Sequence, residues 1–261
     1  MVDEFLHTEN SSLVSKYWWY LAQQILLQLQ MDGYDHFKQT ISRHYFCQVN
    51  KIRDCEETYT RLLYAYVKEH GGIMFDEPQD GHPSGCMIDG RFIGQDMLHT
   101  ALEAMELQKQ IPLSNHSSIL EIGGGYGRLA WYLNQLYPGL RYVIVDIPPA
   151  LYLSRRYLRH HAHTVSTLMP HELATLQERF DVVVAFDCLR EMSREQVSWY
   201  FTQIDRLANH CYATSSETVT IPFADDQVTP PTWPIPARWI LQGTTIPLIP
   251  KNYRNYFWAI Q

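Results

Sequence analysis

Glu121-Ile122-Gly123-Gly124-Gly125-Tyr126-Gly127 is the most informative stretch of this sequence. It directly follows the apolar residues Ile119 and Leu120, and a segment of helical character, residues 128–136, comes after it. The order is that of a strand, a glycine-rich turn and the start of a helix. Glycine lets the backbone of such a turn approach a bound molecule, because it has no Cβ and tolerates positive φ. The helix N-terminus presents unpaired N–H groups at the same place.

Turns of this kind serve two classes of ligand, and the spacing of the glycines separates them. Dinucleotide-binding turns follow the pattern G-x-G-x-x-G. The residue three positions after Gly125 is Arg128, so this pattern is broken in the present chain. Instead, an acidic residue stands two positions before the first of three alternate glycines, Gly123, Gly125 and Gly127. The turn therefore does not predict a dinucleotide site.

A second acidic residue ends the next predicted strand. Residues 142–145 form an apolar run typical of a buried parallel strand, and Asp146 follows it directly. A carboxylate at this position can accept hydrogen bonds from both hydroxyls of a ribose. An isolated Asp after a strand is also a frequent helix cap, and Pro148 and Pro149 do begin another helix here. Glu121 and Asp146 together favour a ligand that contains a ribose.

Several stretches of the chain carry a pattern shared with a known family. They are residues 119–129, 145–153, 169–173, 180–192 and 234–239, and the upstream segment 77–96 fits as well. In these stretches the chain resembles the class I S-adenosylmethionine-dependent methyltransferases. Within that class it is similar to the sugar O-methyltransferases of bacterial polysaccharide and natural-product clusters. The similarity covers roughly residues 75 to 261.

The resemblance implies that S-adenosylmethionine is the cofactor. This molecule carries no phosphate, so the carboxylate of Glu121 can pair with its cationic aminocarboxypropyl end, where a pyrophosphate would be repelled. After the predicted strand 164–169, Met169 is expected to pack on the adenine ring. His171 either hydrogen-bonds the ring edge, faces the acceptor, or is simply a helix-entry residue. The predicted cofactor-binding residues are Glu121, Gly123, Gly125, Tyr126, Asp146, Ile147, Met169 and His171.

Two carboxylates, Asp187 and Glu191, follow the fourth predicted strand and are the candidate catalytic residues. Methyl transfer to a hydroxyl requires an aligned oxygen and a base for the alcohol proton. The resemblance places Glu191 where many small-molecule methyltransferases have a base, with Asp187 supporting it or binding the methionine ammonium. Alternatively, Glu191 caps a helix or pairs with Arg190 or Arg194 on a solvated surface. Other candidates for the base are His171, His82 in the upstream loop and Glu217 after the fifth strand.

The rest of the sequence predicts an α/β fold with a Rossmann-like, mostly parallel sheet. The expected strands are residues 118–122, 142–146, 164–169, 180–186 and 210–215, closed by an antiparallel hairpin of 238–242 with 256–261. The expected N-terminal helices are residues 18–29, which Ser11 or Ser12 can cap, 35–46 and 56–70. We divide the chain into a helical region with a cover loop, 1–94, and a cofactor-binding methyltransferase domain, 95–261. Within the first region, the glycine-rich segment 71–94 is expected to be a loop that serves as a mobile cover or as a linker. The N-terminal helices must bury their apolar faces on this domain or in a homo-oligomer.

Composition and charge exclude several other classes. The formal net charge of the 261 residues is −7, and no run of Lys or Arg appears, so no nucleic-acid partner is expected. The five cysteines show no C-x-x-C spacing, which is typical of reduced thiols in a cytoplasmic protein. Residues 17–31 are apolar, but four glutamines interrupt them, so neither a signal peptide nor a membrane span is expected.

The sequence predicts a methyltransferase that acts on a hydroxyl of a sugar or of a glycosylated small molecule. Methylation of nitrogen or oxygen in a non-sugar natural-product intermediate is the alternative, and a non-catalytic, methyltransferase-like partner subunit is a third reading. No metal site is expected. The His160-His161-x-His163 cluster fits the C-terminal end of a helix, and Asp225-Asp226 fits a turn with solvated carboxylates.

Overall fold

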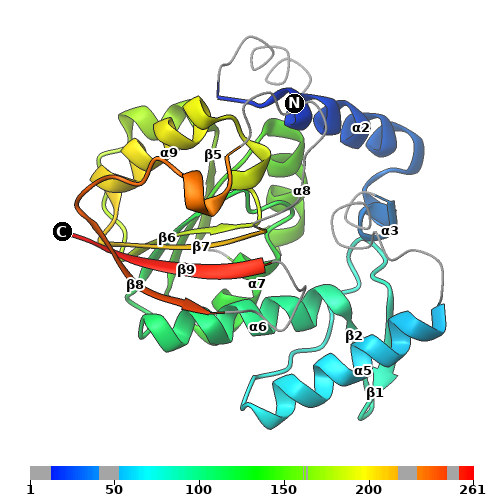
Figure 1. The fold of residues 1–261 in the computed structure, drawn as a ribbon. Helices are drawn as coiled ribbons and strands as arrows, with labels where there is room; N and C mark the ends of the chain where they lie inside the picture. Colours follow the sequence, from blue (N-terminus) through cyan, green and yellow to red (C-terminus); the bar gives the residue numbers. More distant parts are fainter. Residues whose placement is uncertain (1–12, 41–52, 161, 163, 217–227, 246–252) are drawn as a thin grey trace.

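The computed structural model describes residues 13–40, 53–160, 162, 164–216, 228–245 and 253–261. Its centre is a seven-stranded sheet with the strand order β5-β4-β3-β6-β7-β9-β8 (Figure 1). The strands are β3 (Ser118–Ile122), β4 (Arg141–Val145), β5 (Val165–Leu168), β6 (Val182–Phe186), β7 (His210–Ser216), β8 (Trp239–Thr245) and β9 (Tyr253–Ile260). Strands β3 to β7 pair in parallel, whereas β9 is antiparallel to both β7 and β8. The predicted fold class, with its antiparallel C-terminal hairpin, is confirmed.

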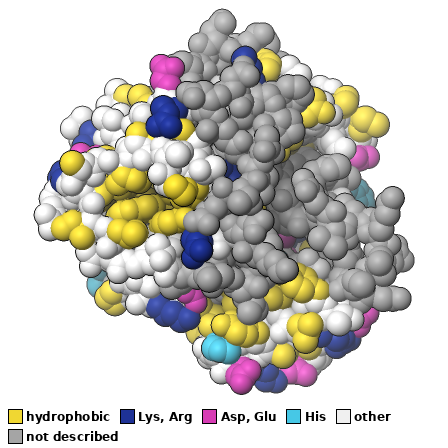
Figure 2. Space-filling view, viewed as in Figure 1, with side chains coloured by type: hydrophobic (Ala, Val, Ile, Leu, Met, Phe, Trp, Pro, Cys, Tyr) yellow, Lys and Arg dark blue, Asp and Glu magenta, His cyan; other side chains and the backbone are white. Residues whose placement is uncertain are grey.

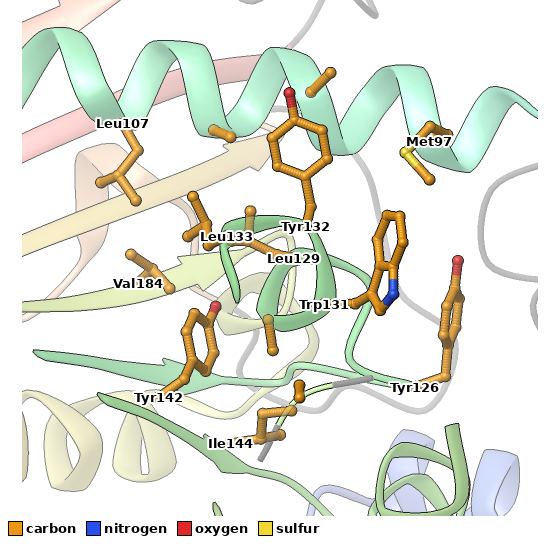
Figure 3. Close-up of a cluster of buried hydrophobic side chains, with 14 of the residues drawn as sticks. Met97, Leu107, Tyr126, Leu129, Trp131, Tyr132, Leu133, Tyr142, Ile144 and Val184 are labelled. Carbon is orange, nitrogen blue, oxygen red and sulfur yellow. The ribbon is translucent and has the colours of Figure 1, made fainter. Parts of the chain in front are cut away.

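Helices cover both faces of this sheet. They are α6 (Gln95–Gln110), α7 (Arg128–Leu136) and α8 (Pro148–Leu158), together with α9 (Arg194–Leu207). The first three pack on the face that carries Tyr142, Ile144 and Val184, and the close-up shows Leu129, Trp131 and Leu133 of α7 between the sheet and α6 (Figure 3). Helix α9 packs on the opposite face with Trp233 and Trp239. Parallel strands buried on both sides need continuous apolar runs, which explains why β4 and β6 show no alternation.

The N-terminal region is helical, as predicted. It contains α2 (Lys16–Asp32), the short 3-10 helix η1 (Tyr34–His36), α3 (Phe37–Thr40) and α5 (Arg53–Glu69). Ser15 caps α2 by accepting the backbone N–H of Trp18 at 3.1 Å, whereas Ser11, Ser12 and residues 41–52 lie outside the described residues. Phe37, Leu63 and Val67 of these helices belong to the same apolar core as α6 and α7. The division of the chain at residues 94 and 95 stays a prediction.

The segment from Gly71 to Gly94 is not simply the loop that its glycines suggested. Its second half forms an antiparallel hairpin of β1 (Gly85–Ile88) and β2 (Arg91–Gly94). Between them lie Asp89 and Gly90, with φ values of 50° and 78°. Positive φ at both central residues is the signature of the two-residue hairpin turn that Asp-Gly favours. The prediction of a loop was therefore wrong for residues 85–94, and a role as cover over the cofactor stays a prediction.

A buried ion pair fastens this segment to α3. Lys38 Nζ donates to Glu77 Oε1 at 2.8 Å, and both side chains are only 2% exposed. The ammonium also donates to the Pro78 carbonyl at 3.2 Å and lies over the rings of Tyr126 and Tyr157. Burying a charge is costly unless it is paired with an opposite charge. Lys38 therefore links the N-terminal helices to Tyr126 in the glycine turn.

Most large apolar side chains are buried, and the exceptions include Ile240 and Leu241 on the outermost strand, β8, which are 41% and 50% exposed. Figure 2 shows apolar side chains on the left of the molecule in this view, over the region of α9 and the C-terminal strands. Within the described part of the chain, no helix combines the length and the apolar character that crossing a membrane requires.

Candidate active site

The glycine turn after β3 has the backbone geometry that its sequence predicts. Gly123, Gly125 and Gly127 all have positive φ, at 74°, 56° and 87°. A Cβ added to Gly123 would stand 2.6 Å from the Cβ of Cys188, whereas one added to Gly125 would meet no atom within 4 Å. Gly123 is thus required by packing inside the protein. Gly125 borders open space, as expected where a backbone approaches a ligand.

Asp146 lies directly beside this turn. Its Oδ2 accepts the backbone N–H of Gly125 at 2.8 Å, and its Oδ1 accepts the N–H of Ile147 at 2.7 Å. The residue is 7% exposed, and burial raises the pKa of its carboxyl to about 7 despite these two donors. A carboxylate held in this way keeps acceptor capacity for additional donors such as ribose hydroxyls.

A narrow pocket lies at the carboxyl ends of β3, β4 and β6. Its walls include Ile122, Gly123, Val145, Asp146, Ile147, Pro170, Cys188, Met192 and Tyr200, and also Leu13, Val14 and Ser15 just before α2 and Trp18 in its first turn. Open α/β sheets bind their ligands at this edge. The free volume is about 20 Å³, whereas pockets for drug-sized ligands typically hold roughly 300–1,000 Å³. The free space between these walls is therefore smaller than in a pocket of that kind.

Glu121 lies behind the glycine turn and is not part of the pocket wall. Its carboxylate is buried and accepts the hydroxyl of Tyr142 at 2.9 Å. A Cβ added to Gly124 would come within 2.8 Å of Glu121 Oε2, so the carboxylate fills the space beneath that glycine. Burial raises the pKa of Glu121 to about 7. Direct pairing of Glu121 with the cofactor stays a prediction, and the geometry gives the residue a supporting position.

Arg128, which breaks the dinucleotide pattern, belongs to a polar layer between α6 and α7. Its guanidinium donates to Glu103 at 2.6 Å and to the Thr100 hydroxyl at 2.7 Å. Next to it, the hydroxyl of Tyr126 donates to Asp96 at 3.0 Å. The side chain of Tyr126 thus points toward α6 (Figure 3), and the Tyr126 contact with cofactor stays a prediction.

Asp187, directly after β6, has an unusual backbone conformation with φ of 57°. Its carboxylate accepts two hydrogen bonds from Arg190, one from Nε to Oδ1 and one from Nη2 to Oδ2 at 2.9 Å. It also accepts the hydroxyl of Tyr253 at 2.7 Å. Left-handed backbone at a residue other than glycine is often found at functional sites. Because these three donors occupy Asp187, its carboxylate orients Arg190 and Tyr253.

Glu191 ends the 3-10 helix η3 (Leu189–Glu191) that follows Asp187. The residue is 8% exposed, so the alternative that placed it on a solvated surface is wrong. Burial, then the neighbouring charge of Asp187, raises the pKa of Glu191 to about 8, while Arg190, 4.0 Å away, lowers it. Trp18 also acts to lower this pKa. Glu191 is therefore a buried carboxyl that titrates near neutral pH.

The structure does not bring the remaining candidates into the pocket wall. His171 is exposed in the 3-10 helix η2 (Pro170–Thr175), which fits the helix-entry reading, and the N–H of Met169 donates to Glu172 at 2.6 Å. Their contacts with cofactor stay predictions. His82 stacks on the ring of His36, with centroids 4.5 Å apart. Glu217, His161, His163 and Asp225-Asp226 lie outside the described residues.

Trp18, Cys188 and Tyr253 are parts of the site that the sequence did not reveal. In the sequence, Trp18 is only the first residue of the expected helix 18–29, and helical periodicity does not show which distant residues a side chain will lie beside. Tyr253 reaches Asp187 across 66 positions of sequence. Among the described residues, no three His, Cys, Asp or Glu side chains form a group that could hold a metal ion.

Comparisons with known proteins bear on both the fold and the chemistry. Residues 120–211 match a family described as a methyltransferase domain. No curated protein matches the chain. Of the solved structures, the PH0226 protein from Pyrococcus horikoshii OT3 is similar with a TM-score of 0.52 and 12% identity, over 62% of this chain and 91% of that one. The glycopeptide N-methyltransferase MtfA, complexed with S-adenosylmethionine, has a TM-score of 0.49 and 14% identity, over 61% and 93%.

The likeness to the PH0226 protein supports the fold alone, because the identity is low. The family match carries more, since it spans the end of β3, the glycine turn, Asp146, Asp187 and Glu191. The glycine turn with its open position at Gly125, together with the buried carboxylate of Asp146, fits a nucleoside cofactor that has no phosphate. The chain carries a class I methyltransferase domain and is an S-adenosylmethionine-dependent methyltransferase.

Proposed function

We propose that this methyltransferase acts on a hydroxyl of a sugar or of a glycosylated small molecule, with Glu191 as the general base. The cofactor supplies an activated methyl group on a sulfonium. The protein binds it, aligns the acceptor oxygen and removes the acceptor proton. The sugar assignment rests on the resemblance of roughly residues 75 to 261 to sugar O-methyltransferases.

The observation that carries the proposal is the environment of Glu191. An alcohol is too weak an acid to lose its proton beforehand, so a base must accept it as the oxygen gains the methyl group. A general base works best when its pKa lies near the operating pH, and the pKa of Glu191 is raised to about 8. Cys188 and Met192, on either side of it in sequence, both line the pocket. A positively charged sulfonium nearby would favour the ionised form of the base.

The proposed cofactor contacts follow from the pocket wall. Asp146 would accept hydrogen bonds from the ribose hydroxyls. Ile147, which is 6% exposed and lines the pocket, would pack against the adenine ring of the cofactor. The open position at Gly125 allows close approach of the backbone. Asp187 acts indirectly in this proposal, by holding Arg190 next to Glu191 and toward the methionine end of the cofactor.

A mass-spectrometric screen tests the function. The protein is incubated with S-adenosylmethionine and separate pools of glycosides, nucleotide-sugars, non-sugar phenols and alcohols, and amines, and each pool is searched for products that gain one methyl group. We expect methylated glycosides or nucleotide-sugars, and none with a folded Asp146→Ala variant. Methylation confined to amines or to non-sugar hydroxyls would overturn the sugar assignment. Cofactor binding without turnover in any pool would favour a non-catalytic partner subunit.

A further inference from the structure

Tyr253, the first residue of β9, reaches the loop that follows β6. Strand β9 is antiparallel to β7, and Tyr253 lies opposite Ser216, the last residue of β7. Because β7 runs parallel to β6, this register brings Tyr253 to the carboxyl edge of the sheet, where Asp187 lies (Figure 1). The Tyr253 hydroxyl donates to Asp187 Oδ2 at 2.7 Å. A side chain of β9 is thus in direct contact with the loop that carries the proposed base.

The Tyr253 side chain contacts both members of the ion pair between Asp187 and Arg190. Its hydroxyl shares Asp187 Oδ2 with Arg190 Nη2, which lies 2.9 Å from that oxygen. The guanidinium carbon of Arg190 lies 5.7 Å from the centre of the Tyr253 ring, which is within the range of cation–π attraction. Because the hydroxyl acts on the acid and the ring acts on the base, Tyr253 restricts the orientation of the whole pair.

The backbone of Asp187 needs such contacts. Its φ of 57° is a conformation that costs energy for a residue with a Cβ, and a residue keeps such a conformation only when the surrounding structure fixes it. The Asp187 N–H donates to the Thr214 carbonyl of β7 at 2.8 Å, and its carboxylate accepts the Tyr253 hydroxyl of β9. Two neighbouring strands therefore hold Asp187, one through its backbone and one through its side chain.

The orientation of the pair matters because Arg190 lies beside Glu191. Arg190 Nη2 is 4.0 Å from Glu191 Oε1, and the two side chains are only 11% and 10% exposed. With so little solvent between them, the positive charge favours the ionised carboxylate. The charges of Asp146 and Asp187 disfavour it. The other titratable groups that face Glu191 are Tyr17, Cys188 and Tyr253.

We propose that Tyr253 is a positioning residue for the general base: its hydroxyl and ring hold the pair of Asp187 and Arg190, and thereby keep the Arg190 guanidinium beside the Glu191 carboxylate. This inference rests on the proposed function of Glu191. Tyr253 acts through Arg190 and takes no proton from the acceptor. When the hydroxyl is removed, Asp187 loses its contact with β9, Arg190 spends less time at 4.0 Å from Glu191, and the ionised form of Glu191 becomes less favourable.

Two NMR measurements on Tyr253→Phe, which keeps the ring and loses the hydroxyl, test the inference without the acceptor. The titration midpoint of Glu191 is followed by ¹³C labelling of glutamate carboxyl carbons, and its resonance is identified by its absence in Glu191→Gln. We expect this midpoint to rise by about half a pH unit or more. Hydrogen exchange of the Arg190 Nε–H, identified by its absence in Arg190→Lys, should become about tenfold faster. Tyr64→Phe removes a matched hydroxyl bond to Asp89, 3.1 Å long, and should change neither quantity.

The two measurements separate positioning from a purely structural role. A lower stability of folded Tyr253→Phe with an unchanged Glu191 midpoint would mean that Tyr253 only braces the sheet, and overturns the inference. A raised midpoint with unchanged exchange of the Arg190 Nε–H would mean that Tyr253 does not act through Arg190, and also overturns it. Near-normal activity of Glu191→Gln would contradict the proposed function alone, because neither measurement uses the acceptor.

Discussion

The backbone N–H of Gly125 and the carboxylate of Asp146 are joined by a 2.8 Å hydrogen bond, across the ends of two neighbouring parallel strands. This hydrogen bond fixes the glycine turn and the acidic strand end relative to each other. A cofactor that contacts both is held by groups already fixed in their bound arrangement, which lowers the entropy cost of binding.

Replacing Asp146 by Ala should weaken binding of S-adenosylhomocysteine by about 10²–10⁴-fold, because two hydrogen bonds to a charged acceptor, each about 1.5–3 kcal/mol, are lost. Isothermal titration calorimetry measures the affinity. Asp181→Ala is the matched control, since Asp181 also accepts two donors from a neighbouring strand, the N–H and hydroxyl of Ser118, at the other end of the sheet. Unchanged affinity in a folded Asp146→Ala protein would contradict the proposed contact between Asp146 and the ribose.

Gly123 and Gly125 should respond differently to replacement by alanine. Gly123→Ala places a Cβ 2.6 Å from Cys188 at a φ of 74°, so we expect a loss of stability of about 2–4 kcal/mol in urea unfolding. Gly125→Ala meets no neighbouring atom and should cost only about 1–2 kcal/mol for its backbone strain. Gly125→Ala should nevertheless reduce the affinity for the cofactor. In Gly123→Ala, any loss of affinity cannot be separated from the loss of stability. Equal stability losses would contradict the packing argument.

Breaking the buried pair of Lys38 and Glu77 should destabilise the protein strongly. Lys38→Met leaves an unpaired buried carboxyl, and we expect a loss of about 3–5 kcal/mol in the free energy of unfolding. Adding Glu77→Leu should recover much of this loss, because the orphaned group is then removed. Lys109→Met, which breaks an exposed pair with Glu106, should change stability by less than about 1 kcal/mol.

Stability should fall as pH rises from about 5 to 8. The pKa of Glu121 is raised to about 7 in the folded protein, above its unfolded value near 4.3. The folded state therefore binds more protons in this window, and a raised acid contributes stability at low pH that is lost as pH rises toward the folded pKa. Urea unfolding at several pH values measures the slope, and Glu121→Gln should reduce it. A slope that the substitution leaves intact would mean that Glu121 titrates normally.

Replacing Glu191 by Gln should lower kcat by about 10²–10⁴-fold while cofactor affinity stays nearly intact. In wild type, kcat should rise with pH to about 8, since the base must be ionised and its pKa is raised to about 8. Steady-state kinetics on the acceptor found by the screen, combined with calorimetry, separates the two effects. Near-normal kcat in the variant would transfer the role to His171 or His82, and alanine variants of these residues would decide between them.

Local signals in the sequence predicted the strands, the glycine turn and Asp146, because each depends on neighbouring residues only. Arg128 to Leu136 was expected as a helix and is one, since glycine before it and apolar spacing within it define both the start and the face. The hairpin at Asp89-Gly90 was missed although its turn signal was present, because its strands are only four residues long. The place of Trp18 in the pocket wall depends on how α2 packs, which periodicity does not encode.

The position of β9 between β7 and β8 has a consequence for synthesis of the chain. Strand β8 is synthesised before β9 but pairs with no other strand of the described sheet. It can therefore join the sheet only after β9 has paired with β7. Until then β7 is an open edge that can pair with another nascent chain. Tyr253, on β9, is also the hydroxyl donor to Asp187. The loop that contains Asp187 therefore reaches its final arrangement only after Tyr253, which lies well beyond the matched residues 120–211, has been synthesised.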